Sequence, residues 1–164
     1  MDNEANCKKL VANGNYLVAK RHRDLVFTSG MTPRSQGVMA HSGTITAERP
    51  IGEFKDAVEL AASNALAAAR SLLACDEEIS GILALTVFIA TTGDFSGHSR
   101  HFASDYLTAE LGPGSAGTRA AISVISLPGG AVVEIQMTAM VEAGRPSGER
   151  EFMGAGDRMS SQPS

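Results

Sequence analysis

The sequence has 164 residues, of which 14 are Lys or Arg and 18 are Asp or Glu, so the formal net charge is −4. Apolar residues make up 43% of the chain, enough for a domain to bury a core without disulfides, and the acidic balance argues against a protein that coats nucleic acid. No stretch approaches the ~20 apolar residues of a membrane-spanning helix, and the polar first ten residues lack the apolar core of an export signal, so we expect a cytoplasmic protein.

Polar segments at both ends set the limits of the folded unit. Residues 1–12 are expected to form a flexible N-terminus. Residues 144–164 are rich in Gly, Ser, Pro and charge and have no apolar period, so we expect a disordered tail. Residues 13–143 are then a single domain.

The first half of this domain begins with two short strands, predicted at 15–20 and 24–29 and joined by a polar turn. Residues 30–47 contain a proline and three glycines, and we expect a loop there with one short edge strand at most. A long helix is predicted over about 52–75, because Val, Ala and Leu recur at helical spacing.

The second half of the domain is also predicted to combine strands with a helix. The nearly continuous apolar run at 79–91 predicts a central strand that is buried on both faces. A second helix is predicted at about 95–111, before Gly112-Pro113-Gly114. Strands are predicted at 118–126 and 131–142, joined as a hairpin by a Leu-Pro-Gly-Gly turn. The whole order is typical of an α+β fold.

The predicted hairpin brings two charged residues to one sheet face. Alternate residues of the final strand are all apolar, and Glu134 lies on its other face. Ile122 is assigned to the apolar face, because mixing the faces would bury charge. Parity then places Arg119 and Ala121 on the semi-polar face with Glu134. If Ile122 pairs with Ile135, Arg119 and Glu134 lie roughly 13 Å apart at ~3.3 Å per residue, too far for a salt bridge.

Three interpretations of this pair stay open. The gap between Arg119 and Glu134 holds a small substrate, or the site draws the two residues from different chains, or Arg119 pairs with another carboxylate of the sheet. Two helices can cover one face of a single sheet, and the second face is not polar enough to remain in water. We therefore expect a homo-oligomer whose subunits meet through this face.

A metal site is not expected. His98 and His101 are three residues apart, but zinc needs further ligands, and the sequence offers only scattered carboxylates near them. Cys7 and Cys75 are far apart and form no CxxC motif, which is typical of reduced thiols.

Short motifs follow one another along the domain. Tyr16 precedes a strand that ends in Ser29-Gly30, and Pro33 comes shortly after. In the middle of the chain, Thr86-Val87-Phe88 is followed by Asp94-Phe95.

The closing signature is Arg119, a short apolar strand, Leu127-Pro128 and Glu134. In order and spacing, these motifs resemble the Rid family of reactive-intermediate (enamine/imine) deaminases, also called YjgF-like or L-PSP endoribonucleases. The resemblance runs from about residue 14 to residue 142 and is weaker at Gly14-Asn15-Tyr16, where the family has a proline after the glycine.

The resemblance implies a chorismate-mutase-like mixed sheet with two helices on one face, assembled as a homotrimer with active sites in clefts between subunits. It implies that Arg119 holds a substrate carboxylate and that Glu134 positions or activates water. Tyr16 and the Ser29-Gly30 backbone would shape the pocket. Ala121 would contribute to it too, at a position where the family often has Cys or Ser.

The implied reaction is the hydrolysis of small enamines or imines, such as 2-aminoacrylate, to a 2-keto acid and ammonia without a cofactor. The residue types fit this chemistry, since the planar fork of an arginine binds both oxygens of a carboxylate. One alternative is a non-catalytic regulatory protein that binds a small carboxylate in the same cleft. The other is an endoribonuclease, against which the net charge of −4 speaks.

Overall fold

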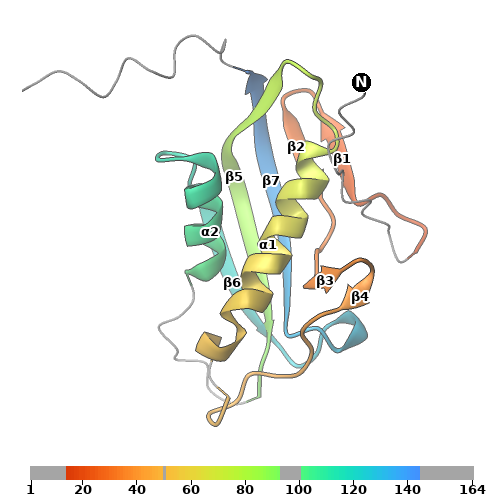
Figure 1. Ribbon diagram of the computed structural model, residues 1–164, viewed down its shortest axis with the longest axis vertical. Coiled ribbons are helices and arrows are strands. Elements are labelled where there is room, and N and C mark those ends of the chain that lie inside the picture. Colours follow the sequence, from red (N-terminus) through yellow and green to blue (C-terminus); the bar gives the residue numbers. More distant parts are fainter. Residues whose placement is uncertain (1–13, 50, 93–100, 145–164) are drawn as a thin grey trace, which may run out of the picture.

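The computed structural model describes residues 14–49, 51–92 and 101–144. These residues form a five-stranded mixed sheet and the helices that pack against it (Figure 1). The strands are β1 Ala19–His22, β2 Leu25–Thr28, β5 Glu77–Ala90, β6 Thr118–Val124 and β7 Val133–Ala143. Their order across the sheet is β1-β2-β7-β5-β6. Neighbours are antiparallel except β5 and β6, which are parallel. This is the α+β architecture that the sequence predicts.

The predicted hairpin of the last two strands is wrong. β5 lies between β6 and β7, so that Phe88 pairs with Ile122 on one side and with Glu134 on the other. The chain passes from β6 to β7 through the short 3-10 helix η2, Pro128–Gly130. A hairpin would have left one edge of the apolar strand β5 unpaired, whereas the observed order gives both edges of β5 a hydrogen-bonded neighbour.

Bulges in β5 decide which of its residues face the helices. The register with β7 shifts between Ile79 and Gly81 and again between Ile82 and Ala84. An extra residue at each shift returns the next large side chain to the same face. Ile79, Ile82 and Leu85 are therefore all buried although they are spaced three apart.

Both helices cover one face of the sheet (Figure 1). Helix α1, Lys55–Arg70, follows the 3-10 helix η1, Ile51–Phe54, and is shorter than predicted at both ends. It buries a stripe of small side chains, which lets its backbone lie close to the sheet. The stripe comprises Ala57, Val58, Ala61, Ala62, Ala65, Leu66, Ala68 and Ala69. Helix α2, Phe102–Leu111, packs beside α1 and contacts β5. The start predicted for α2, at residue 95, lies outside the described residues.

The opposite face of the sheet is left open by the described part of the chain. It carries Phe27 and Ile122, which are 45% and 42% exposed, and the partly buried Phe88 and Glu134. The prediction that β5 is buried on both faces is therefore wrong for the single chain. The prediction of a semi-polar second face is confirmed, although its members differ from those assigned from the sequence.

The N-terminal half contains two small hairpins. The turn between β1 and β2 lies at Arg23-Asp24 and begins two residues later than the turn predicted at 21–23. A separate two-stranded sheet, β3 Arg34–Ser35 and β4 Val38–Met39, lies in the predicted loop. Its connecting residues Gln36 and Gly37 both have positive φ, as a tight two-residue hairpin turn requires.

Some predictions concern residues that the structure does not describe. These are the flexible N-terminus at 1–12 and almost all of the disordered tail at 144–164. Of the helices in the described ranges, none combines the length and apolar character needed to cross a membrane.

Candidate functional site

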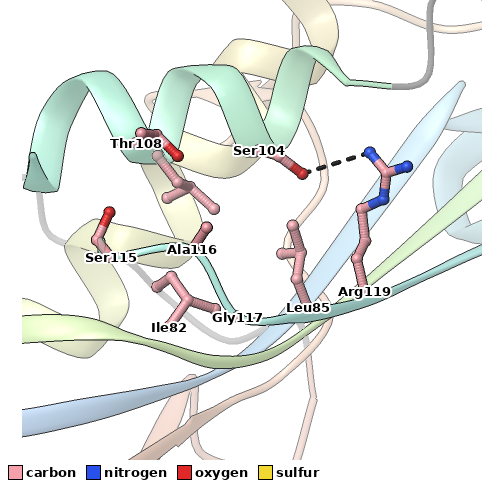
Figure 2. Close-up of a pocket in the computed structure, with 9 residues that line it drawn as sticks. Ile82, Leu85, Ser104, Thr108, Ser115, Ala116, Gly117 and Arg119 are labelled. Atoms are coloured by element: carbon pink, nitrogen blue, oxygen red, sulfur yellow. Dashed lines mark hydrogen bonds between the residues drawn. The ribbon is translucent and has the colours of Figure 1, made fainter. Parts of the chain in front are cut away.

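Arg119 lies on β6, the strand at one outer edge of the sheet. It pairs with the buried Leu85, and its side chain therefore projects from the face that carries the helices. The guanidinium reaches the start of α2, where Nη1 lies 3.1 Å from Nδ1 of His101. Nη1 also lies 3.4 Å from Oγ of Ser104 (Figure 2). Because a guanidinium nitrogen can only donate, Nδ1 of His101 is the acceptor in this contact. Arg119 is nevertheless exposed, so a ligand can reach it.

A small pocket opens beside Arg119, between α2 and the strands beneath it (Figure 2). Its inner wall is apolar and consists of Ile82, Leu85 and Leu107, each at most 5% exposed. The remaining lining comes from Ser104, Thr108, Ser115, Ala116, Gly117 and Arg119. The pocket has an interior volume of about 30 Å³.

Glu134 lies on β7, near the middle of the sheet, and its side chain is partly buried on the open face. Its carboxylate packs directly against Gly30, where a Cβ atom would overlap Oε1. Only glycine leaves space for the carboxylate in this position. Burial raises the pKa of the Glu134 carboxyl above its usual range, because removal from water disfavours the charged form.

Two hydrogen bonds hold the segment that follows Tyr16 close to Ser29, beside Gly30. The hydroxyl of Ser29 donates a hydrogen bond of 2.6 Å to the carbonyl of Leu17, and the amide of Ser29 donates one of 2.9 Å to the carbonyl of Val18. Tyr16 precedes this pair of contacts and is 51% exposed. Tyr16, Ser29, Gly30 and Glu134 thus form one local group, which we call the Glu134 half.

Ala121 belongs to a different group. It pairs with the buried Val87, two residues along β6 from Arg119, and lies on the same face as Arg119. We call Arg119, Ala121, His101 and Ser104 the Arg119 half.

The prediction that Arg119 and Glu134 share one sheet face is wrong. Arg119 pairs with Leu85 on the helix-covered face, whereas Glu134 pairs with Phe88 on the open face. The prediction failed because it placed Ile122 among the helix-facing residues so as not to bury charge. On an outer strand this argument does not apply, since Arg119 faces the helices and still remains exposed.

Sequence reasoning missed His101 and Ser104 as partners of Arg119. In the sequence His101 stands out only by its spacing from His98, which lies outside the described residues. The spacing of three residues between His101 and Ser104, at the start of a helix, was a usable signal, because residues three apart share one helix face. Across the described ranges, no three His, Cys, Asp or Glu side chains come together in a way that could hold a metal ion.

The similarity to known proteins covers most of the chain. The sequence model of the family described as Endoribonuclease L-PSP matches residues 7–141. No protein with a curated description matches the sequence.

Solved structures with this fold come from several bacteria. A protein of unknown function from Agrobacterium tumefaciens is 28% identical, with a TM-score of 0.69 and coverage of 78% of this chain and 83% of that one. A candidate endoribonuclease from Shewanella oneidensis MR-1 is 25% identical, with a TM-score of 0.71 and coverage of 80% and 88%. RidA from the Antarctic bacterium Psychrobacter sp. PAMC 21119 is 23% identical, with a TM-score of 0.59 and coverage of 82% and 94%, and supports the fold alone.

The family match, the fold and the order of the motifs agree, and the chain therefore belongs to the endoribonuclease L-PSP family, also known as the YjgF or Rid family.

Proposed function

We propose that this protein hydrolyses small imines and enamines that carry a carboxylate, releasing a 2-keto acid and ammonia. The observation that carries the proposal is the contrast between an exposed arginine, Arg119, and a partly buried carboxylate with a raised pKa, Glu134. The first suits the binding of an anion, and the second suits proton transfer.

Arg119 would bind the substrate carboxylate. Its guanidinium is the side chain best suited to hold both oxygens at once, which fixes the orientation of the neighbouring C2 atom. His101 and Ser104 contact the guanidinium and would hold it in place before the substrate arrives.

Glu134 would serve as the general base. Its carboxylate accepts a proton from water while the water oxygen bonds to the imine carbon, and the electron pair of the C=N bond moves to nitrogen. That proton passes to the nitrogen and gives a carbinolamine. A second proton then moves from its hydroxyl, through Glu134, to the amine, the C–N bond breaks as the C=O bond forms, and the products are the 2-keto acid and ammonia. The raised pKa of Glu134 makes it a stronger base than an ordinary carboxylate.

We further propose that one site uses two subunits, in a homotrimer. Within one chain Arg119 and Glu134 lie on opposite faces of the sheet, so a second copy is needed to bring the Arg119 half of one chain to the Glu134 half of another. The exposed Phe27 and Ile122 on the open face support burial against another copy.

Turnover of freshly generated imines tests the reaction, with ammonia and 2-keto acid measured together. Arg119→Ala should lower kcat/KM by about 100-fold or more, because a charge pair with the substrate is lost. Glu134→Gln should lower kcat by about 100-fold or more, because proton transfer is lost. Undiminished turnover in either variant would refute the role given to that residue.

Mixing these two inactive variants tests the shared site. If Arg119 and Glu134 come from different chains, a trimer that contains both variant chains has one intact site, and activity returns. If both residues act within one chain, mixing restores nothing. Light scattering gives the oligomeric state, and a monomer at micromolar concentration would exclude the shared site.

A non-catalytic carboxylate-binding protein would show binding that depends on Arg119 but no ammonia release. Cleavage of RNA would support the activity in the family's name. The net charge of −4 speaks against it, and we expect any such activity to disappear on further purification.

A further inference from the structure

We infer that His101 is a second ligand of the substrate carboxylate and takes up a proton from solvent when the carboxylate binds. This inference rests on the proposed function, because it assumes that the carboxylate binds Arg119. In the structure Nη1 of Arg119 donates to Nδ1 of His101 at 3.1 Å, and both side chains are exposed. The imidazole therefore stands where a carboxylate would reach the guanidinium.

The contact between Arg119 and His101 has to change when an anion binds Nη1. A carboxylate oxygen that enters between Nη1 and Nδ1 accepts the hydrogen bond of the guanidinium and leaves Nδ1 without a donor. An imidazole nitrogen without a proton would then direct its lone pair at an anion, which is unfavourable. A protonated nitrogen instead donates to the same anion. Histidine is the side chain that changes its charge in this way near neutral pH.

Ser104 adds a third donor to the same position. Its Oγ lies 3.4 Å from Nη1, and Figure 2 shows the two side chains turned toward each other. His101 and Ser104 are three residues apart at the start of α2, so they share one helix face. A hydroxyl rotates to suit its partner. Guanidinium, imidazolium and hydroxyl can therefore all donate to one carboxylate, and the two charged donors make the stronger bonds.

Two charged neighbours act on His101 in opposite directions. Arg119, on β6, disfavours a second positive charge until a carboxylate lies between them. Asp105 lies one turn later on α2, where its amide donates to the carbonyl of His101 at 2.8 Å. Its exposed carboxylate favours the protonated imidazole. A bound carboxylate screens Arg119 and adds to Asp105, so it moves the balance toward the protonated form.

Charged side chains on the neighbouring helix α1 are engaged elsewhere. Arg70 pairs with Glu110 of α2 at 3.6 Å. Glu59 lies about three helical turns before Arg70, on the same side of α1, and pairs with Lys55 at 3.5 Å. The ligand is therefore the new charge that decides whether His101 is protonated, and by linkage a lower pH must strengthen carboxylate binding.

Isothermal titration of the full-length protein with pyruvate, a stable 2-keto acid of the proposed product class, tests the inference without turnover. Titrations in HEPES and in Tris, which have different heats of ionisation, count the protons that are taken up. Near pH 7 we expect about half a proton per bound pyruvate, and binding about fivefold tighter at pH 6 than at pH 8, as for one charge-assisted hydrogen bond.

The variant that tests the role of His101 is His101→Gln, in which the amide can form hydrogen bonds but cannot take a proton. Proton uptake should disappear, and the affinity should become nearly independent of pH. Glu134→Gln should keep the uptake, which excludes Glu134 as the group that is protonated. His22→Gln is the matched control, since His22 is exposed on β1 at the opposite edge of the sheet, and it should also keep the uptake.

NMR of isotope-labelled imidazole nitrogens gives a second measurement on the unmodified chain, because Nδ1 of His101 should become protonated when pyruvate is added. Binding that depends on Arg119 without proton uptake, or uptake that survives in His101→Gln, would overturn the role of His101 and leave the carboxylate site in place. If Arg119→Ala binds pyruvate as well as the unmodified protein does, the carboxylate site and the role of His101 both fail.

Discussion

The Glu134 half and the Arg119 half of the candidate site are held in place by different means. Glu134 lies on β7, a strand with hydrogen-bonded neighbours on both sides, and its carboxylate packs against the backbone at Gly30. Arg119 lies on an outer strand and is held through side-chain contacts with His101 and Ser104. The comparison indicates that packing against the backbone holds the Glu134 carboxylate, whereas side-chain contacts hold the Arg119 guanidinium at the edge of the sheet.

The strongest test of this contrast is a substitution at Gly30, where the backbone lies close to the Glu134 carboxylate. In Gly30→Ala the new Cβ atom would overlap Oε1 of Glu134 and force the carboxylate to move. We expect kcat/KM for imine hydrolysis to fall by about 100-fold, which is the size of a lost general-base contribution. The matched control is Gly52→Ala, where a Cβ atom meets nothing within 4 Å. Near-normal turnover in Gly30→Ala would show that the position of Glu134 is not critical.

Substitution of two threonines compares how much the centre and the edge of the sheet contribute to the free energy of unfolding. The hydroxyl oxygen of the buried Thr28 accepts the Met137 amide at 3.0 Å, across β2 and β7. In Thr28→Val this buried amide loses its partner, and we expect the free energy of unfolding to fall by about 1–3 kcal/mol. The exposed Thr118, on β6, donates to the carbonyl of Leu83, and Thr118→Val should cost no more than about 0.5 kcal/mol.

Urea unfolding at one fixed protein concentration measures both threonine variants, because the stability of an oligomer depends on concentration. Equal losses in Thr28→Val and Thr118→Val would contradict the difference between a fixed centre and a loosely held edge.

The pH dependence of turnover separates the two halves chemically. Burial raises the pKa of Glu134, and the base works only as the carboxylate, so kcat/KM should fall as the pH drops through this raised pKa, about tenfold per pH unit below it. The midpoint should lie above the usual carboxyl range. Glu134→Gln should lose this acidic limb together with most of its activity, while His101→Ala should keep the limb. A profile in which the wild-type midpoint lies at or below an ordinary glutamate value would argue against the assignment.

The smallest effect is expected from loss of the contact between Arg119 and His101 at the start of α2. His101→Ala removes one of the partners that hold the Arg119 guanidinium, and we expect KM to rise by about threefold with kcat nearly unchanged, as for a single exposed hydrogen bond. His22→Ala, on the exposed end of β1, is the control. A large fall in kcat instead would move His101 from positioning Arg119 into the chemistry itself.

Much of the fold could be predicted because it depends on local patterns. The helical spacing over about 52–75 and the apolar run at 79–91 predict α1 and β5, with end errors of a few residues. The pairing of β6 could not be predicted in this way. Periodicity shows that a segment is a strand, but it does not identify the neighbouring strand or its direction.

The candidate site shows the same limit. Parity along β6 correctly groups Arg119 with Ala121, since residues two apart share a face. Parity could not show whether Arg119 and Ala121 lie on the helix-covered face or on the open face. That assignment requires the register of β6 with a neighbouring strand whose faces are known. The wrong hairpin therefore placed Arg119 beside Glu134, although their roles in the proposed reaction remain a prediction.

By itself the sequence determined the α+β class and the order of the main helices and strands, and it indicated Arg119 and Glu134 as candidate residues whose roles are a prediction. Tertiary structure alone decided that β5 separates β6 from β7, that Arg119 and Glu134 lie on opposite faces, and that His101 and Ser104 contact Arg119. The physical reason is that helical and strand periodicity act over a few residues. Strand order and side-chain partners instead depend on which distant segments bury the most apolar surface together.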